Sequence, residues 1–269
     1  MYIISAVLDK SRATVALYDK EYKLLLKKDG ACENAASLCS EIISEAGIKP
    51  SDVEFIGVAA NDTSASAEIE KATGIRCLGA TIVGAKALGE AYTANDVATL
   101  IVLNVDDTVE CGIVIDKKLY CGTHGHIGDF GHMVINFDGY ECSCGRRGCF
   151  EAYAGNGGLR RIAADAGVAN AKDINHKTLF ASDSPEAKTA KRLYMEYLAS
   201  GITNIINLFQ PREFVLEGPF TEVGNALMDE MMEIILRDQY THSMPDKSNI
   251  RFANTSADTV LLGAALLGR

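Results

Sequence analysis

The chain opens with short apolar stretches separated by polar turns. Residues 3–9, 12–19 and 22–28 each read as a strand, and they follow one another closely enough for a β-meander. Residues 34–46 then carry apolar side chains at three- and four-residue spacing, which predicts an amphipathic helix that ends at Gly47. The opening therefore predicts three antiparallel strands followed by a helix.

Strand and helix patterns then alternate along the chain. We expect a strand, a helix, a second strand and a second helix at 53–60, 64–73, 75–78 and 80–93. This alternation is typical of a mostly parallel sheet covered by helices.

A second meander begins near Val97, and its order repeats that of the first half. The expected elements are strands at 97–105, 108–116 and 117–122, a long helix at 186–209, a strand at 213–218, a helix at 220–238, a strand at 251–256 and a helix at 258–267. We predict an internally duplicated fold with two lobes. One comprises residues 1–95, completed by the C-terminal helix in 255–269, and the other comprises 96–254 with the metal-binding loop described below.

Composition narrows the classes of function. A chain of 269 residues with 48% hydrophobic residues can bury a large core. Its net charge of −10 and the absence of any Lys/Arg run longer than two argue against nucleic acid, which requires a clustered basic surface. No apolar run approaches the roughly 20 residues of a membrane helix, and the N-terminal residues do not resemble a secretion signal. We expect a cytoplasmic protein with neither nucleic acid nor membrane as partner, whose eight cysteines serve better as metal ligands than as disulfides.

Three cysteines lie close together in residues 131–151, GHMVINFDGYECSCGRRGCFE. Cys142 and Cys144 are separated by one residue, Cys149 follows five residues later, and two glycines allow the turn to fold back. Three thiolates and one imidazole would form a closed, structural Zn²⁺ site. The alternative is a disulfide beside unpaired buried thiols. The candidates for the fourth ligand are His132, His124 and His126.

The same stretch resembles the signature of the ROK family of repressors, open reading frames and kinases. That signature is an acidic residue, any residue and Gly-His, followed by C-x-C-G-x-x-G-C-x-E. Shorter matches extend the resemblance over nearly the whole chain: GVAA at 57–60, ALGEA at 87–91, LEGPF at 216–220 and TVLLGAALL at 259–267. The resemblance implies an α/β, actin-like ATPase (ribonuclease-H-like) fold with duplicated βββαβαβα halves. It also implies a homodimer in which ATP, Mg²⁺ and a hexose or N-acetylhexosamine meet, as in a glucokinase-like enzyme.

The resemblance also implies roles for individual residues. Asp129, His132 and Glu151 would contact sugar hydroxyls, and His132 would complete the zinc site with the three cysteines. The positions that match nucleotide-binding segments of the family are Asp9, Asp106, Asp107 and Gly218.

The expected catalytic base is missing. Phosphoryl transfer to a sugar hydroxyl needs a carboxylate within hydrogen-bond reach of the attacking oxygen. The family carries it in an Asn-Asp pair before L-G-E, where this chain has Thr81 and Ile82. Asp62, which follows a predicted parallel strand, or Asp9 could substitute. The alternative for Asn61-Asp62 is a turn that caps the helix at 64–73.

Both phosphate loops also depart from the family. The first, D-x-G-G-T, reads DKSRAT at 9–14, and the second, G-T-G-I-G, is replaced by a segment with Asp106 and Asp107. A carboxylate about 6 Å from a phosphate charge costs about 2–3 kcal/mol at an effective dielectric near 20, unless a metal intervenes. The segment between GVAA and the next strand is shorter than the family's insert, so the resemblance implies that residues lining part of the sugar pocket are missing as well.

Three hypotheses follow. The first is a sugar kinase-like protein with structural zinc that lacks efficient ATP-dependent phosphorylation and binds a sugar or acts in regulation. The second is an active hexose or N-acetylhexosamine kinase in which Asp62 or Asp9 is the base and Asp106 and Asp107 hold Mg²⁺. The third is a relative of transcriptional regulators without their DNA-binding domain, since the meander begins at residue 2.

Overall fold

The computed structural model describes residues 1–62, 64–123, 128–238, 247–254, 256 and 258–269. They form two compact units. The first comprises Met1–Val102, Gly112–Gly122 and Asn254–Arg269, and the second comprises Leu103–Cys111 and Thr123–Ala253. The division into lobes 1–95 and 96–254 stays a prediction.

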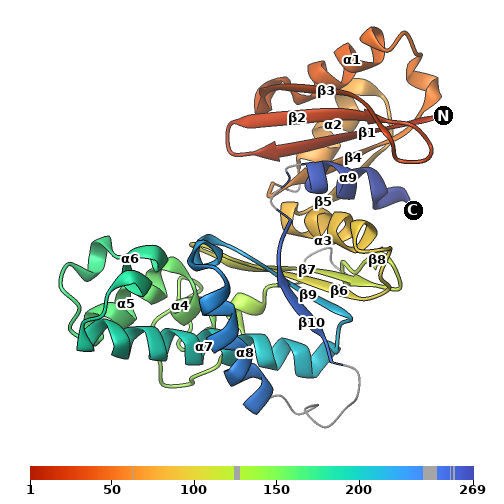
Figure 1. The fold of residues 1–269 in the computed structure, drawn as a ribbon. Coiled ribbons are helices and arrows are strands. Elements are labelled where there is room, and N and C mark those ends of the chain that lie inside the picture. Colours follow the sequence, from red (N-terminus) through yellow and green to blue (C-terminus); the bar gives the residue numbers. More distant parts are fainter. Residues whose placement is uncertain (63, 124–127, 239–246, 255, 257) are drawn as a thin grey trace. The chain divides into compact units, whose positions relative to one another are not determined.

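The first unit is built on a five-stranded mixed sheet with the order β3-β2-β1-β4-β5 (Figure 1). Strands β1 and β2 pair antiparallel, as do β2 and β3, so the predicted meander is confirmed. Strand β4 pairs parallel with both β1 and β5. The strands are β1 (Tyr2–Asp9), β2 (Arg12–Tyr18), β3 (Leu24–Ala31), β4 (Val53–Ala60) and β5 (Cys77–Ala80).

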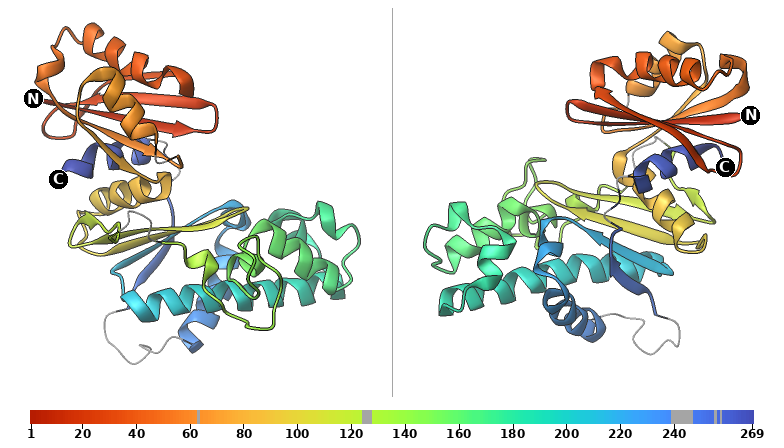
Figure 2. Two further views of the ribbon diagram at one scale, coloured as in Figure 1. Left: turned by 180° about the vertical axis from the view of Figure 1, so that it is seen from behind. Right: turned by 45° about the horizontal axis from the view of Figure 1, so that its top comes forward.

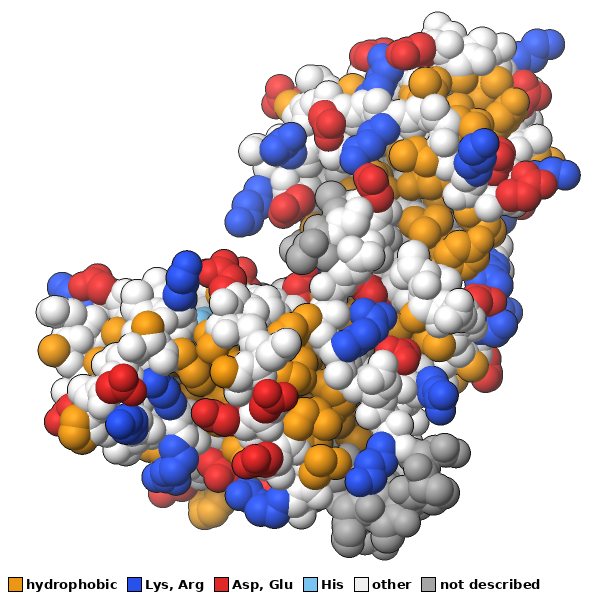
Figure 3. Space-filling model, in the orientation of Figure 1, with side chains coloured by type: hydrophobic (Ala, Val, Ile, Leu, Met, Phe, Trp, Pro, Cys, Tyr) orange, Lys and Arg blue, Asp and Glu red, His pale blue; other side chains and the backbone are white. Residues whose placement is uncertain are grey.

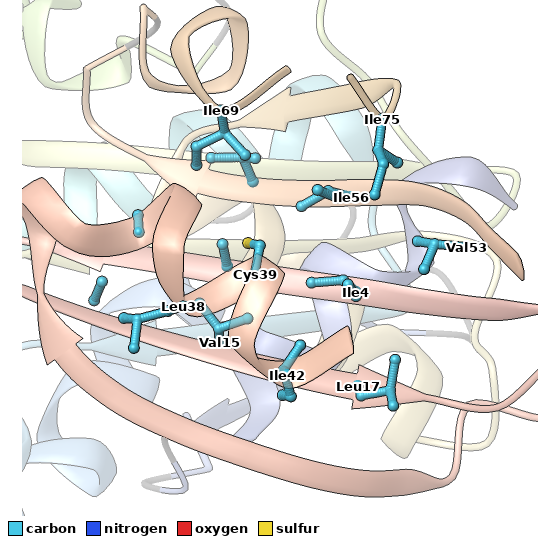
Figure 4. Close-up of a cluster of buried hydrophobic side chains, with 14 of the residues drawn as sticks. Ile4, Val15, Leu17, Leu38, Cys39, Ile42, Val53, Ile56, Ile69 and Ile75 are labelled. Atoms are coloured by element: carbon cyan, nitrogen blue, oxygen red, sulfur yellow. The ribbon is translucent and has the colours of Figure 1, made fainter. Parts of the chain in front are cut away.

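Helices cover both faces of this sheet, as Figures 1 and 2 show. Helices α1 (Ala35–Glu45) and α2 (Ala65–Thr73) lie on one face, and α9 (Asp258–Ala265) lies on the other, packed against α3 (Ile82–Thr93). The apolar stripe predicted for α1 faces the strands. The buried side chains that meet there include Leu38, Cys39 and Ile42 of α1, Val15 and Leu17 of β2, and Ile56 of β4 (Figure 4).

Glycines bring α3 and α9 into close contact. A Cβ added at Gly89 would lie 2.0 Å from the Thr259 carbonyl oxygen, and one added at Gly263 would lie 1.7 Å from that of Ala85. No larger residue fits at either position without moving a helix. The ALGEA and LLGAALL matches therefore correspond to one helix contact in the first unit.

The second sheet also has five strands, in the order β10-β9-β6-β7-β8. Strands β9 and β10 are parallel, whereas β7 and β8 are antiparallel. The predicted strand over 117–122 shrinks to two residues. The strands are β6 (Leu100–Val105), β7 (Val109–Ile115), β8 (Lys118–Leu119), β9 (Glu213–Glu217) and β10 (Asn249–Phe252).

The helices of the second unit surround α7 (Pro185–Phe209), which confirms the long helix expected there. Ser184 caps its N-terminus by accepting a hydrogen bond from the Ala187 amide, and Pro185 occupies the first turn, where a missing N–H is harmless. The pattern at 220–238 instead splits into a 3₁₀ turn and a helix, because Gly224 has a φ of +83°. The other helices are α4 (Glu151–Ala154), α5 (Asn156–Asp165), α6 (His176–Ala181) and α8 (Asn225–Asp238).

The surface carries charges of both signs. On the face shown in Figure 3, Lys and Arg side chains alternate with Asp and Glu side chains and form no continuous basic patch. Among the described residues, no helix has both the length and the apolar character needed to cross a membrane.

Candidate metal and sugar site

The predicted zinc ligands lie together in the second unit. The ligand atoms of His132, Cys142, Cys144 and Cys149 are all within 4.8 Å of one another. The Cys142 Sγ is 3.6 Å from His132 Nδ1, and the sulfurs of Cys144 and Cys149 are also 3.6 Å apart. With Zn–S bonds of about 2.3 Å, the edge of a tetrahedral site is about 3.8 Å, close to the two separations of 3.6 Å, so these four residues could hold a zinc ion.

A tight hairpin brings the cysteines together. The Cys142 amide donates to the Arg146 carbonyl oxygen, and the Gly148 amide donates to that of Tyr140. Gly148 has a φ of +76°, and a Cβ there would lie 1.5 Å from the Asn136 carbonyl oxygen. Gly145 also has a positive φ, of +84°, but its surroundings are open. The two glycines expected to permit the turn therefore do so for different reasons.

All eight cysteines are free thiols. A backbone hydrogen bond at Arg146 lowers the pKa of Cys144 to about 7, whereas burial raises the pKa of Cys149. A bound zinc ion would take each of its cysteine ligands as a thiolate. The alternative histidines, His124 and His126, lie outside the described residues.

Glu151 is fixed directly beside this cluster, at the first residue of α4. Its Oε1 accepts a hydrogen bond from the Ser143 hydroxyl at 3.0 Å, and its Oε2 accepts one from the Val109 amide at 3.1 Å. The Cys142 Sγ is 3.9 Å from Oε1. The structure thus brings together two of the predicted sugar contacts, Glu151 and the ligand residue His132.

Asp129, the third predicted sugar contact, precedes a 3₁₀ turn that ends at His132. The Asp129 carbonyl oxygen accepts a hydrogen bond from the His132 amide at 3.0 Å, and the side chain is exposed. An exposed carboxylate at this position is available to a ligand.

The turn that replaces the family's second phosphate loop is held by hydrogen bonds from another part of the same unit. The Asn156 side-chain amide donates to Asp106 at 2.6 Å and to Asp107 at 3.1 Å, and the Asn156 backbone amide donates to the Asp106 carbonyl oxygen. Asn156 begins α5. The turn between β6 and β7 is therefore closed onto this helix. Gly218, with a φ of +138°, packs against the end of β6, where a Cβ would lie 2.0 Å from the Val105 carbonyl oxygen.

The candidate substitute bases lie at one edge of the first sheet. Leu8 pairs with Ala60 in neighbouring parallel strands, so Asp9, the last residue of β1, and Asp62, two residues beyond β4, lie at the carboxyl ends of these strands. Such edges commonly bind ligands. However, Asp62 accepts a hydrogen bond from the Ser64 amide at 2.9 Å, which lowers the pKa of the Asp62 carboxyl. This is the turn geometry that the sequence offered as the alternative.

Thr81 and Ile82 follow β5 at the same edge. The Thr81 hydroxyl accepts a hydrogen bond from the Gly84 amide at 3.1 Å and so caps α3. Ile82 packs against a buried apolar cluster that includes Ala59 of β4 and Val260 of α9. The position of the expected carboxylate base is thus part of the hydrophobic packing.

Sequence reasoning missed Ser143, Asn156 and a buried pair behind α4. The Tyr194 hydroxyl donates to the Ala154 carbonyl oxygen at 2.8 Å and lies 2.7 Å from His176 Nε2. This pair supports the end of α4. Ser143 could have been noticed from its place between two ligand cysteines, but nothing in the sequence connects Asn156 with Asp106, fifty residues away.

The likeness to curated proteins covers part of each relative. The xylose repressor of Bacillus spizizenii is 32% identical over 153 residues, which are 55% of this chain and 38% of the repressor. The glucokinase of Halalkalibacterium halodurans is 28% identical over 202 residues, 67% of this chain and 60% of that enzyme. The matched segments span less than two thirds of either relative.

The likeness to solved structures covers nearly the whole chain. A ROK hexokinase from Thermus thermophilus superposes with a TM-score of 0.84 at 23% identity, covering 99% of this chain and 97% of that one. A ROK glucokinase from Streptomyces griseus, in complex with glucose and AMPPNP, has a TM-score of 0.71 at 20% identity, and each chain is covered to 98%. The expected α/β, actin-like fold is confirmed.

The model of the ROK family matches residues 54–269, which include the cysteine cluster, the α3–α9 contact and the closed β6–β7 turn. This chain belongs to the ROK family.

Proposed function

We propose that this chain is a zinc-containing, sugar-binding member of the ROK family that lacks efficient ATP-dependent phosphorylation and acts through binding or regulation. The proposal rests on one observation. Where the resemblance expects a base, Ile82 packs against an apolar cluster, and where it expects a phosphate loop, Asn156 donates hydrogen bonds to Asp106 and Asp107. Two of the three residues that the resemblance assigns to the sugar, His132 and Glu151, lie in or beside the cysteine cluster.

The first support is the packing of Ile82. Its side chain lies against Ala59 and Val260, which are apolar and buried. The Ile82 side chain is itself half-buried, and it has no oxygen that could accept a proton from a sugar hydroxyl. Loss of a general base alone slows a reaction by about 10²–10⁴-fold. We therefore do not expect this chain to phosphorylate a sugar as fast as a ROK kinase that has the base.

The second support is the closed turn between β6 and β7. A phosphate-binding loop presents free backbone amides to the nucleotide. Here two carboxylates occupy the turn, and Asn156 holds both of them against α5. Nucleotide binding would have to break these hydrogen bonds and overcome the repulsion between the carboxylates and the phosphates.

The residues that the resemblance assigns to the sugar are polar and all belong to the second unit. His132 and the three cysteines fit zinc, which would supply structural order to a loop and contributes about 10 kcal/mol or more in small zinc modules. Glu151 keeps acceptor capacity beyond its two internal hydrogen bonds. With the exposed Asp129, these groups could accept hydrogen bonds from sugar hydroxyls.

The active-kinase hypothesis meets a specific difficulty at Asp62. The amide of Ser64 stabilises the charged form of its carboxyl, and the resulting lower pKa makes Asp62 a weaker base. Asp106 and Asp107 could still hold Mg²⁺ if Asn156 released them. This hypothesis therefore predicts a measurable affinity for ATP·Mg²⁺ that depends on both aspartates.

The relatives include a regulator as well as an enzyme. The xylose repressor matches this chain at 32% identity over 153 residues, and the glucokinase matches it at 28% over 202 residues. The sugar panel for a binding test should therefore include xylose beside glucose, N-acetylglucosamine and N-acetylmannosamine. A homodimer and a cytoplasmic location stay predictions, and light scattering of the purified protein tests the first.

Calorimetric titration of the zinc-loaded protein tests the proposal. We expect saturable heat with at least one sugar and none with ATP·Mg²⁺. Glu151→Ala should abolish the sugar heat, whereas Glu141→Ala, at an exposed position in the same hairpin, should preserve it. Heat with ATP·Mg²⁺ that disappears in the Asp106→Ala, Asp107→Ala double variant would instead support the active-kinase hypothesis.

A further inference from the structure

Ser143 contacts both the predicted metal-binding cluster and Glu151. It lies between the ligand residues Cys142 and Cys144, so a bound metal would restrain its backbone on both sides. The Ser143 hydroxyl lies 3.8 Å from the Cys142 Sγ, and it also donates a hydrogen bond to Glu151 Oε1 at 3.0 Å. Ser143 therefore links the metal-binding turn to Glu151, the proposed sugar contact, by a hydrogen bond shorter than the 3.9 Å contact from the Cys142 Sγ.

Glu151 is held from two directions. The Val109 amide, at the start of β7, binds Oε2 at 3.1 Å, and Ser143 binds Oε1. The amide belongs to a strand backbone and does not depend on the turn. With this bond alone the carboxylate could still rotate about its terminal bond, where the torsional preference is weak. The second hydrogen bond, from Ser143, restrains that rotation.

We propose that Ser143 is a positioning residue that couples zinc occupancy to sugar affinity by orienting the carboxylate of Glu151. The inference rests on the proposed function, since it concerns the same sugar site. With zinc bound, the turn presents the Ser143 hydroxyl to Glu151, and the carboxylate is ordered before the sugar arrives. Without zinc the hydroxyl is no longer held in place, and the sugar must order Glu151 at the expense of its affinity.

The geometry also defines which substitutions are informative. Alanine at position 143 removes the hydroxyl but leaves the exposed turn and all four metal ligands unchanged. Threonine keeps the hydroxyl and adds a methyl group at an exposed site. Ser200→Ala is a matched control in the same unit, because the Ser200 hydroxyl donates to the Glu196 carbonyl oxygen within α7.

The experiment compares the wild type with Ser143→Ala, Ser143→Thr and Ser200→Ala, each with zinc content and sugar Kd measured. We expect one zinc per chain in all four proteins. A hydrogen bond to a charged group corresponds to about tenfold in affinity, so Ser143→Ala should raise the sugar Kd about tenfold. Ser143→Thr and Ser200→Ala should remain within about twofold of the wild type. After chelation, the difference between the wild type and Ser143→Ala should disappear.

The outcomes separate this inference from the proposed function. A wild-type protein that binds no sugar removes the proposed function, and this role with it. A wild type that binds sugar while Ser143→Ala binds equally well removes only the role of Ser143. The same conclusion follows if Ser143→Thr fails to restore affinity, or if Ser143→Ala loses its zinc.

Discussion

His176 shows how a single buried group can determine a pH response. Because Tyr194 donates its proton to Ala154, His176 must donate from Nε2 to the Tyr194 oxygen. Its Nδ1 is buried and has no hydrogen-bond partner among the described residues. Burial, with a smaller effect of Arg160, lowers the pKa of His176 to about 4.

This pKa predicts a loss of stability in acid. Between about pH 6.5 and pH 4 the unfolded chain binds a proton at His176 that the folded chain does not, so stability falls as the pH falls. We expect His176 to lower the free energy of unfolding by about 2 kcal/mol from pH 7 to pH 5. Urea unfolding of the wild type and His176→Phe at both values measures this difference, and other titrating groups cancel. An identical pH dependence in both proteins would refute the assignment.

The two glycines of the metal-binding hairpin offer a second comparison of single residues. Gly145→Ala should cost about 1 kcal/mol, since it strains φ in open space. Gly148→Ala should cost about 3 kcal/mol or more, because its Cβ also meets the Asn136 carbonyl oxygen. Denaturant unfolding with zinc present would show the difference. Equal costs would mean that the hairpin relaxes around position 148.

At the scale of elements, periodicity predicted what is long and regular. Helices α1 and α7 and strand β4 lie within one or two residues of the expected bounds. Strand β5 lies two residues later than expected, because only register with β4 decides which part of a short apolar run pairs. Helices α4, α5 and α6 were not predicted, because they are too short to give a clear periodic pattern. All three pack against α7, and this packing stabilises them more than their own sequence does.

In the metal-binding hairpin, we expect a zinc ion to provide the stability that apolar packing provides elsewhere. We expect one zinc per chain in the wild type and in Cys121→Ser, and none in Cys144→Ser, as measured by elemental analysis. Chelation should lower the melting temperature of the first two proteins, because a ligand of the folded state stabilises it. The melting temperature of Cys144→Ser should not respond. Zinc retained by Cys144→Ser would contradict the four-ligand assignment.

At the scale of the whole molecule, local sequence motifs identified the family but not the state of its site. The cysteine spacing and the Gly-His motif predicted a cluster that the structure assembles. The sequence also showed that positions 82, 106 and 107 depart from the family's motifs. It could not show that Ile82 packs with Val260 or that Asn156 binds Asp106, because these residues meet only in the folded chain. Contacts between residues far apart in the sequence therefore carry the functional conclusion.

That conclusion is tested most directly by a phosphorylation assay. The zinc-loaded protein is incubated with ATP·Mg²⁺ and, in turn, glucose, N-acetylglucosamine, N-acetylmannosamine and xylose, and sugar phosphate is measured against a protein-free blank. Our account predicts no product above the blank with any sugar, including one that binds by calorimetry. Turnover well above the blank with any of these sugars would contradict it, and loss of that turnover in Asp62→Asn or Asp9→Asn would establish a kinase with displaced catalytic groups.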